Sequence, residues 1–151
     1  MSVNRVEAIQ SIQDKHPTAA IIYSNGLTSR EAAHFCHRPG NYYLLHGMGE
    51  ALSVGVGLKQ ARPDIDVVVV DGDGNAAMGL ASSCMLPLEG LTYYVLDNQS
   101  YETTGGQPTF FLDDKVPQAT VIKIATGKED TPNPPAPEQI QAEFSAWLAR
   151  K

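Results

Sequence analysis

The chain has 151 residues, a length that fits one domain built around a single hydrophobic core. Hydrophobic residues make up 42% and charged residues 19%, as in ordinary soluble globular proteins, and no apolar run approaches the length of a membrane span. The formal net charge is −6 and Lys and Arg form no basic stripe, so we expect neither a nucleic acid nor a membrane as a partner.

Five helices and five strands follow from the hydrophobic periodicity and from the Gly and Pro breaks. In chain order we predict helix 3–15, strand 19–23, helix 28–36, strand 42–45, helix 47–60, strand 67–70, helix 78–88, strand 91–96, strand 121–124 and helix 138–148. The unbroken valine run at 67–70 is typical of a strand covered on both faces of a parallel sheet, and we predict that it is central. Strands that alternate with helices imply right-handed crossovers, so the predicted fold class is α/β, with a mostly parallel central sheet and helices on both faces.

Two of the predicted helices carry local sequence signals. Thr28 and Glu31 have the spacing of a capping box, in which the Thr28 side chain caps the amino terminus of its helix. The helix 47–60 is rich in glycine, alanine and serine, and glycine lowers intrinsic helix propensity. We therefore expect another element to approach this helix closely.

The amino terminus and the two cysteines indicate a compartment. Residues 1–15 carry Glu7 and Asp14 among scattered apolar residues and lack the basic-then-apolar order of a signal peptide, so we expect cytoplasmic residence. Cys36 and Cys84 lie far apart with no CxxC pair, which predicts two reduced, buried thiols rather than a disulfide.

Acidic and amide side chains follow two neighbouring predicted strands. The segment 71–75 (Asp-Gly-Asp-Gly-Asn) follows the central strand, and Asn98 follows the next strand. Open α/β sheets bind ligands at the carboxyl ends of their strands. Asp73 and Asn98 offer hard oxygen ligands, which complete the octahedron of Mg²⁺ together with a backbone carbonyl, water and diphosphate oxygens. Gly72 and Gly74 let the backbone turn sharply and expose N–H groups to an anion, so the predicted ligand is a diphosphate bridged through magnesium.

The segment Asp-Gly-Asp-Gly-Asn alone is also compatible with a simple turn, because these are the commonest turn residues. Its pairing with Asn98, one helix and one strand later, resembles the GDG...N signature of thiamine-diphosphate enzymes, near the short end of the usual interval. Five motifs occur in the order seen in phosphonopyruvate and sulfopyruvate decarboxylases: GLTSRE at 26–31, HGMG at 46–49, GDGN at 72–75, LDN at 96–98 and TGGQPT at 104–109.

The chain thus resembles the cofactor-binding domain, or beta subunit, of the phosphonopyruvate and sulfopyruvate decarboxylase family. The match runs in register over residues 19–109, and residues 122–148 resemble the closing strand, proline-rich turn and helix of that family. The resemblance implies a three-layer thiamine-diphosphate-binding fold, with residues 1–151 as one diphosphate- and magnesium-binding domain.

The resemblance also assigns roles to individual residues. It implies that the side chains of Asp73 and Asn98 and the carbonyl of Ser100 bind Mg²⁺, and that Gly74 and Asn75 meet the diphosphate through backbone N–H groups. The implied cofactor contacts are His46, Gly47, Met48, Gly72, Asp73, Gly74, Asn75, Asn98, Ser100 and Tyr101.

His46 and Met48 are the residues implied in catalysis. Met48 aligns with the bulky apolar residue that holds the two cofactor rings in a V, although methionine is more often a core filler. The His46 carbonyl is expected to accept a hydrogen bond from the 4′-amino group. Relatives usually have Gly-Ser where this chain has His46-Gly47, so the imidazole is either structural or a group for proton transfer or substrate contact.

A second departure from the family is a shortening after Thr109. Only residues 110–120 stand where we expect the family to carry an additional helix, strand and helix. A strand and its covering helices are therefore expected to be missing or to be supplied by the partner.

Arg30 and Gln107 are candidates for binding an anionic substrate, because a guanidinium matches a phosphonate or carboxylate in a bidentate way. The alternative for Arg30 is a surface residue paired with a carboxylate. His34, Cys36 and His37 form a small cluster, but no second ligand pair has zinc-site spacing, so we expect helix surface and core there.

Taken with its implied cofactors, thiamine diphosphate and Mg²⁺, the resemblance implies the beta subunit of a two-subunit 2-oxo acid decarboxylase. It would convert a 3-phosphono- or 3-sulfopyruvate-like 2-oxo acid to an aldehyde and CO₂. The family needs a glutamate from a pyrimidine-binding domain, which this sequence lacks, so an alpha subunit and a hetero-oligomer are expected. The alternatives are a carboligase subunit for natural-product synthesis, a non-catalytic regulatory or scaffold subunit, a ferredoxin oxidoreductase beta subunit, which normally needs more cysteines, and a generic nucleotide-binding protein.

Overall fold

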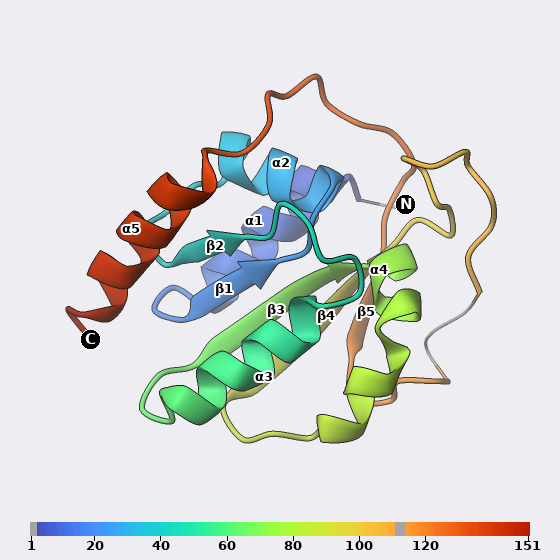
Figure 1. Cartoon of the computed structure of the whole chain (residues 1–151). Helices are drawn as coiled ribbons and strands as arrows, with labels where there is room; N and C mark the ends of the chain where they lie inside the picture. The colour runs from blue at the N-terminus through green and yellow to red at the C-terminus, as the bar shows by residue number, and fades with distance from the viewer. Residues whose placement is uncertain (1–2, 111–113) are drawn as a thin grey trace.

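The structure, a computed structural model, describes residues 3–110 and 114–151, and within them the core is a sheet of five parallel strands (Figure 1). The strands are β1 (Ala20–Tyr23), β2 (Asn41–Tyr43), β3 (Val67–Gly72), β4 (Leu91–Asp97) and β5 (Thr120–Lys123). Their order across the sheet is β2-β1-β3-β4-β5. The order reverses between β1 and β3, and such switch points are where open parallel sheets bind ligands.

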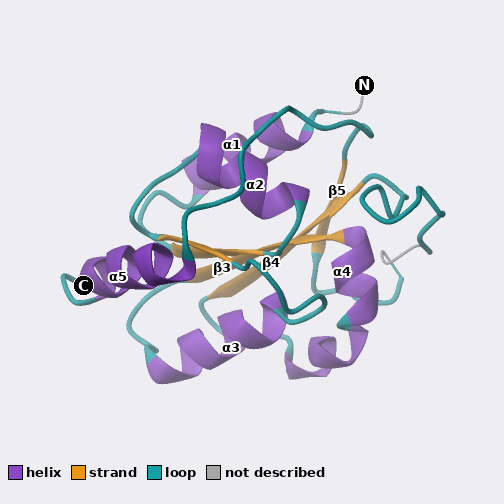
Figure 2. Cartoon of the chain, turned by 45° about the horizontal axis from the view of Figure 1, so that its top comes forward, coloured by secondary structure: helices purple, strands orange, loops and turns teal. Residues whose placement is uncertain are grey.

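Helices cover both faces of the sheet (Figure 2). They are α1 (Arg5–Lys15), α2 (Leu27–Phe35), α3 (Ala51–Ala61), α4 (Asp73–Met78) and α5 (Pro137–Leu148), with a 3₁₀ turn at Leu80–Met85. α1 and α2 lie on one face, α3 and α4 lie on the other, and α5 lies beside the edge strand β2. The predicted α/β class is confirmed.

Strand β3 is central, as the valine run predicted. Val68 and Val70 join the apolar cluster under α1 and α2, whereas Val67 and Val69 join the cluster on the face covered by α3. All four side chains are fully buried. Burial stabilises the fold by roughly 1.5–3 kcal/mol for each aliphatic side chain, so this strand contributes several kcal/mol to the hydrophobic core.

Helix α3 approaches β3 so closely that one position requires glycine. A Cβ built on Gly55 would lie 2.2 Å from Val69 Cγ2, far inside van der Waals contact. The expected close approach to this glycine-rich helix is therefore confirmed. The helix begins only at Ala51, because Gly47 and Gly49 before it adopt positive φ angles of 77° and 82°.

The predicted capping box at Thr28 is wrong. Helix α2 begins one residue earlier, and no side chain caps it. Glu31 instead pairs with Arg5 at 2.9 Å, because a carboxylate that is only 2% exposed requires a cationic partner. A capping box is present at α1, where the Asn4 side chain accepts from the Glu7 N–H and the Glu7 side chain accepts from the Asn4 N–H.

The predicted helix 78–88 is also wrong. Helix α4 ends where the predicted helix should begin, and the chain continues as the 3₁₀ turn. The two segments part at Gly79, whose backbone packs so tightly that a Cβ would lie 2.0 Å from the Gly49 carbonyl oxygen. No residue of the 3₁₀ turn is buried, so Cys84 is exposed and the prediction of a buried thiol holds only for Cys36.

The shortened segment 110–120 includes residues 111–113, which lie outside the described residues. The remainder leads directly into β5, which pairs with β4 in parallel and forms the edge of the described sheet. Among the described helices, none combines the length and hydrophobicity needed to cross a membrane.

Candidate functional site

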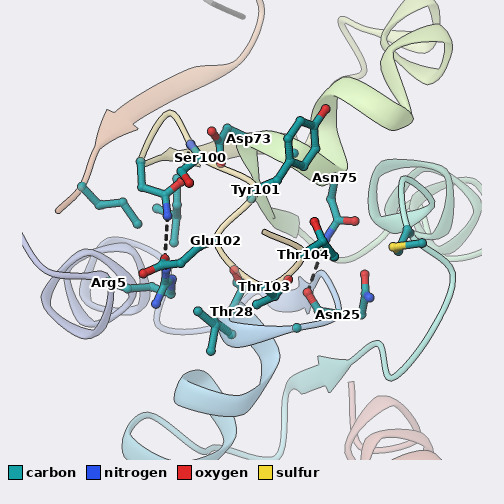
Figure 3. A pocket seen from close by; sticks show the side chains of 18 of the residues that line it. Arg5, Asn25, Thr28, Asp73, Asn75, Ser100, Tyr101, Glu102, Thr103 and Thr104 are labelled. Atoms are coloured by element: carbon teal, nitrogen blue, oxygen red, sulfur yellow. Dashed lines mark hydrogen bonds and ion pairs between the residues drawn. The ribbon is translucent and has the colours of Figure 1, made fainter. Parts of the chain in front are cut away.

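A cleft opens at the carboxyl ends of β1, β3 and β4, next to the switch point of the sheet (Figure 3). Three segments form most of it: 25–28 after β1, 72–75 after β3 and 100–104 after β4. The cleft is completed by Arg5, Met48, Met78, Leu96, Asn98 and Ile124. Parallel strands end at the same edge of the sheet, so three turns that are distant in the sequence meet there.

Asp73 presents a buried carboxylate to the cleft, with 4% of the residue exposed. Thr109 Oγ1 donates to its Oδ2 at 2.6 Å, and the carboxyl group of Asp97 lies beside it. Burial raises the pKa of Asp73 and the neighbouring Asp97 adds to this effect, while the hydrogen bond from Thr109 offsets part of it. A bound cation would favour the charged form of these carboxyl groups, so the site suits a hard divalent metal ion.

Asn98 lies in a tight turn that directly follows β4. Its Oδ1 accepts from the Ser100 N–H at 3.1 Å, and its Nδ2 donates to Glu102 Oε2 at 2.7 Å. Gln99 adopts a φ of 60°, in the left-handed region that non-glycine residues rarely visit, and its N–H donates to Asp97 Oδ1 at 2.8 Å. These bonds define the conformation of the turn and hold Asn98 at the cleft.

Tyr101 lies over the glycine-rich turn. A Cβ on Gly74 would come within 2.8 Å of two ring carbons of Tyr101, so a larger residue would displace the ring. Asn75 Nδ2 donates to the Asn25 carbonyl at 3.3 Å and links the turn after β3 to the turn after β1. The backbone at Gly74 is therefore part of a compact cradle of small and polar groups.

Most of the predicted cofactor contacts line this cleft. They are Met48, Gly72, Asp73, Gly74, Asn75, Asn98, Ser100 and Tyr101. His46 lines a second cavity instead, and Gly47 lines neither. Met48 is 59% exposed, so the alternative that it fills the core is wrong.

Several residues of the cleft were missed by sequence reasoning. The turn after β1 contributes Asn25, Gly26 and Thr28. The GLTSRE motif includes two of these residues, but none of the three was predicted to line the site, because strand order is not readable from the chain. No sequence pattern predicts the contact between Arg5 and Glu102, because 97 positions separate them.

The second cavity has a volume of about 470 Å³ and adjoins the cleft. The two share Asn25, Gly26, Leu27 and Thr103 in their walls. Arg30 and His46 also line the second cavity, between the turn after β1 and the segment 133–136.

Arg30 is held in this wall without a carboxylate partner among the described residues, so the alternative of a surface ion pair is wrong. One Nη donates to the Thr131 carbonyl, and the Arg30 Nε is buried with no partner. Two further buried polar atoms nearby lack partners, Asn25 Oδ1 and Thr131 Oγ1. Buried polar groups rarely remain unpaired, so this region favours binding of a polar ligand. Gln107 is exposed and lines neither cavity.

The cluster His34, Cys36 and His37 is occupied by contacts within the protein. His37 contacts the Tyr43 hydroxyl at 2.8 Å and Glu143 at 3.2 Å, and the His34 ring packs edge-on against Phe35. Within the described residues, no group of three or more His, Cys, Asp or Glu side chains has the arrangement of a metal site.

An all-parallel sheet with a glycine-rich turn, a carboxylate and an amide at its switch point defines an α/β domain that binds a phosphorylated cofactor. The chain belongs to the family described as "Thiamine pyrophosphate enzyme, C-terminal TPP binding domain", which it matches over residues 24–136.

Two similar proteins refine this assignment. Phosphonopyruvate decarboxylase of Streptomyces hygroscopicus is 38% identical over 109 residues, which cover 70% of this chain and 27% of that protein. Sulfopyruvate decarboxylase subunit beta of Methanothermobacter thermautotrophicus is 36% identical over 113 residues, which cover 73% of this chain and 60% of that protein. The match therefore spans about a quarter and about three fifths of these relatives.

A solved structure shares the fold. The thiamine diphosphate-dependent 4-hydroxybenzoylformate decarboxylase of Rhodococcus jostii RHA1 superposes with a TM-score of 0.63 over 86% of this chain and 34% of that chain. Its sequence identity is 16%, so the likeness concerns the fold alone.

Proposed function

We propose that the chain is the diphosphate-binding, or beta, subunit of a two-subunit thiamine-diphosphate-dependent 2-oxo acid decarboxylase. Its substrate is a 3-phosphono- or 3-sulfopyruvate-like 2-oxo acid, and its products are an aldehyde and CO₂. The observation that carries the proposal is the meeting of Asp73, Asn98 and the glycine-rich turn in one cleft of a thiamine pyrophosphate enzyme domain. The names of the two relatives support the substrate class.

The cofactor is proposed to lie in the cleft through its diphosphate. The side chains of Asp73 and Asn98 and the carbonyl of Ser100 would bind Mg²⁺, and the N–H groups of Gly74 and Asn75 would meet the diphosphate. An all-oxygen donor set beside a buried carboxylate fits this metal. When bound, thiamine diphosphate supplies the carbanion that adds to the 2-oxo carbon and the electron sink for decarboxylation.

Met48 and His46 are proposed to act at the reacting end of the site. The exposed Met48 side chain at the cleft is available to support the two cofactor rings, and the His46 carbonyl would accept from the 4′-amino group. The His46 imidazole belongs to the adjoining cavity, where it would transfer a proton or contact substrate. Turnover that is unchanged in His46→Gly in the assembled enzyme would contradict the role of the imidazole.

The adjoining cavity is proposed to hold the anionic end of the substrate. Arg30 offers a buried Nε that no described residue pairs with, and among the described residues no acidic side chain lines this cavity, so its wall suits an anion. Gln107 remains a predicted substrate contact. Arg30→Lys keeps the charge but removes the planar fork, and we expect a higher KM for the 2-oxo acid with little change in kcat.

A partner subunit is proposed because two relatives of this chain are named sulfopyruvate decarboxylase subunit beta. The partner, an alpha subunit, would carry the pyrimidine-binding domain and its catalytic Glu, and the active enzyme would be a hetero-oligomer.

Reconstitution tests this proposal. The purified chain with thiamine diphosphate, Mg²⁺ and 3-phosphonopyruvate or 3-sulfopyruvate is expected to release no CO₂, and addition of the alpha subunit is expected to start turnover. Robust turnover by the chain alone would overturn the two-subunit proposal. An added aldehyde acceptor separates decarboxylation from carboligation, because only a carboligase forms a new carbon–carbon product. A scaffold subunit would show no cofactor-dependent heat in calorimetry of the complex.

A further inference from the structure

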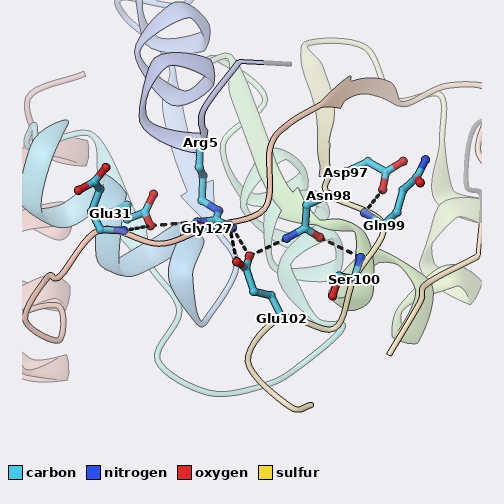
Figure 4. A network of polar contacts seen from close by, with 9 residues as sticks. Arg5, Glu31, Asp97, Asn98, Gln99, Ser100, Glu102 and Gly127 are labelled. Atoms are coloured by element: carbon cyan, nitrogen blue, oxygen red, sulfur yellow. Dashed lines mark hydrogen bonds and ion pairs between the residues drawn. The ribbon is translucent and has the colours of Figure 1, made fainter. Parts of the chain in front are cut away.

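A chain of charged side chains leads from helix α1 to Asn98 (Figure 4). Arg5 is only 6% exposed and donates from Nη1 to Glu31 Oε1 at 2.9 Å and from Nη2 to Glu102 Oε2 at 3.0 Å. The same oxygen of Glu102 accepts from Asn98 Nδ2 at 2.7 Å. The amide of a proposed metal ligand is therefore bonded to a carboxylate that is itself paired with a buried arginine.

We infer that Glu102 and Arg5 are positioning residues that fix which end of the Asn98 amide faces the metal position. This inference rests on the proposed function. A carboxylate only accepts hydrogen bonds, so the nitrogen of the Asn98 amide must face Glu102. In the flipped orientation, the amide oxygen would oppose the carboxylate oxygen, and the amide nitrogen would oppose the Ser100 N–H.

The carboxylate of Glu102 is itself held at both oxygens. The Gly127 N–H donates to Oε1, while Arg5 binds Oε2 and also donates from Nη1 to the Gly127 carbonyl at 3.1 Å. Glu102 therefore cannot rotate without losing a hydrogen bond. Charge-assisted bonds of this kind are stronger than neutral ones, so the orientation of the amide is well defined.

The network also assigns a functional role to helix α1. Arg5 lies in the first turn of this helix, outside the segment 24–136 that matches the cofactor-binding family, yet it lines the cleft. Ligands bind a preorganised metal site more tightly than a mobile one, because groups that fix a ligating side chain lower the cost of ordering it. The amino-terminal helix is thus part of the cofactor site of this chain.

Arg5 has a second partner, Glu31, so the effect of Glu102 on the metal site can be tested apart from its effect on the fold. Glu31 pairs with the same arginine and accepts from the Glu129 N–H at 3.2 Å, but it does not touch Asn98. In Glu102→Ala, Arg5 keeps its bond to Glu31, so the buried guanidinium retains a charged partner. Loss of Glu102 is therefore expected to affect the metal site more than the fold.

The test is Mn²⁺ binding to the purified full chain in the presence of millimolar thiamine diphosphate, followed by the electron paramagnetic resonance signal of free Mn²⁺. Glu102→Ala is expected to weaken Mn²⁺ binding by about 10-fold, the usual effect of removing a group that orients a metal ligand. Glu102→Gln keeps an oxygen that can accept from Asn98, and it is expected to recover most of that loss. Glu129→Ala removes a nearby exposed carboxylate and is expected to bind like the unmodified chain.

A second readout needs no metal. In nitrogen-15 NMR spectra, the Asn98 side-chain NH₂ is expected to lose its hydrogen-bonded shift in Glu102→Ala, while the backbone spectrum and the Tm stay close to those of the unmodified chain. Equal Mn²⁺ affinity of Glu102→Ala and the unmodified chain would overturn this inference and leave the proposed function standing. Failure of the unmodified chain to bind Mn²⁺ with thiamine diphosphate, alone and with its partner, would overturn the proposed function and this inference with it.

Discussion

Two buried carboxyl groups where β3 ends, those of Asp71 and Asp73, lie in surroundings that disfavour their charge, and Asp73 lines the cleft. Asp73 lies beside Asp97 in a buried position, and Asp71, two residues earlier, is 2% exposed with the Tyr93 hydroxyl donating to its Oδ2 at 3.0 Å. Buried charge without full compensation lowers the stability of the free protein. Such an arrangement is expected at a site that gains its missing partner from a ligand.

Asp73→Asn is expected to stabilise the ligand-free chain and to weaken its binding of Mg²⁺. The amide removes a charge that burial and Asp97 disfavour, so the Tm of the ligand-free chain rises. Affinity for Mg²⁺ with thiamine diphosphate falls by at least about 10- to 100-fold, because loss of a charged ligand costs no less than loss of a group that orients one. Calorimetry and thermal unfolding measure the two effects, and Asp64→Asn, which alters an exposed ion pair with Arg62, is the control. Undiminished binding would exclude Asp73 as a ligand.

The raised pKa of Asp71 predicts that the stability of the fold depends on pH. Burial raises the pKa of Asp71 from 3.8 to about 7, so between these values the folded chain holds a proton that the unfolded chain releases. The stability that protonated Asp71 provides is complete below pH 3.8 and is lost as the pH rises to 7.

Asp71→Asn removes this titration. Between pH 4 and pH 8, the free energy of unfolding of the variant relative to the unmodified chain is expected to increase by about 2–4 kcal/mol. Urea unfolding at several pH values measures it, with the exposed Asp130→Asn as a control that should show no such trend. A difference that is flat with pH would contradict a raised pKa for Asp71.

At the scale of elements, the packing of α3 against β3 sets the tightest steric demand in the sheet. Periodicity predicted both elements, and the glycine content predicted that another element approaches this helix closely. Only the structure identifies β3 as that element and Gly55 as the contact point, and it leaves Gly57 in open space. Both glycines lie in the same helix, but only the face that carries Gly55 meets Val69.

This difference gives a matched pair of substitutions. Gly55→Ala is expected to lower the free energy of unfolding by about 1–3 kcal/mol, because its Cβ overlaps Val69 Cγ2. Gly57→Ala is expected to raise it by about 0.5–1 kcal/mol, because alanine favours the helix and nothing lies within 4 Å of the new Cβ. Urea unfolding of both variants measures the effects, and equal effects would contradict the packing of α3.

A long-range contact decides the amino-terminal end of α2, where local spacing predicted a capping box. The Thr28–Glu31 spacing matched a capping box, yet Glu31 binds Arg5, a residue 26 positions away. Local spacing favours a local bond, but a buried carboxylate gains more from a cation than from a backbone N–H. The same long-range competition explains why the network at Asn98 was not foreseen.

At the scale of the whole molecule, the two cysteines differ in burial, so their reactivity tests the packing of the fold. Cys36, which caps the carboxyl end of α2, is 5% exposed, and burial raises the pKa of its thiol, whereas Cys84 is exposed on the 3₁₀ turn. One thiol per chain is therefore expected to react rapidly with Ellman's reagent at pH 8, and the second only after denaturation. Cys84→Ser should remove the rapid phase, and a rapid phase that persists would contradict the burial of Cys36.

The sequence by itself determined the class of sheet, the central strand and the glycine-rich turn with its acidic and amide residues. These features depend on local composition and periodicity, since side-chain hydrophobicity decides which residues are buried and glycine decides where the backbone turns. The order of the five strands, the turn after β1 that joins the cleft, and the link from Arg5 through Glu102 to Asn98 were decided by the tertiary structure alone. Each of these depends on contacts between residues far apart in the chain. The spacing of neighbouring residues gives no information about such contacts.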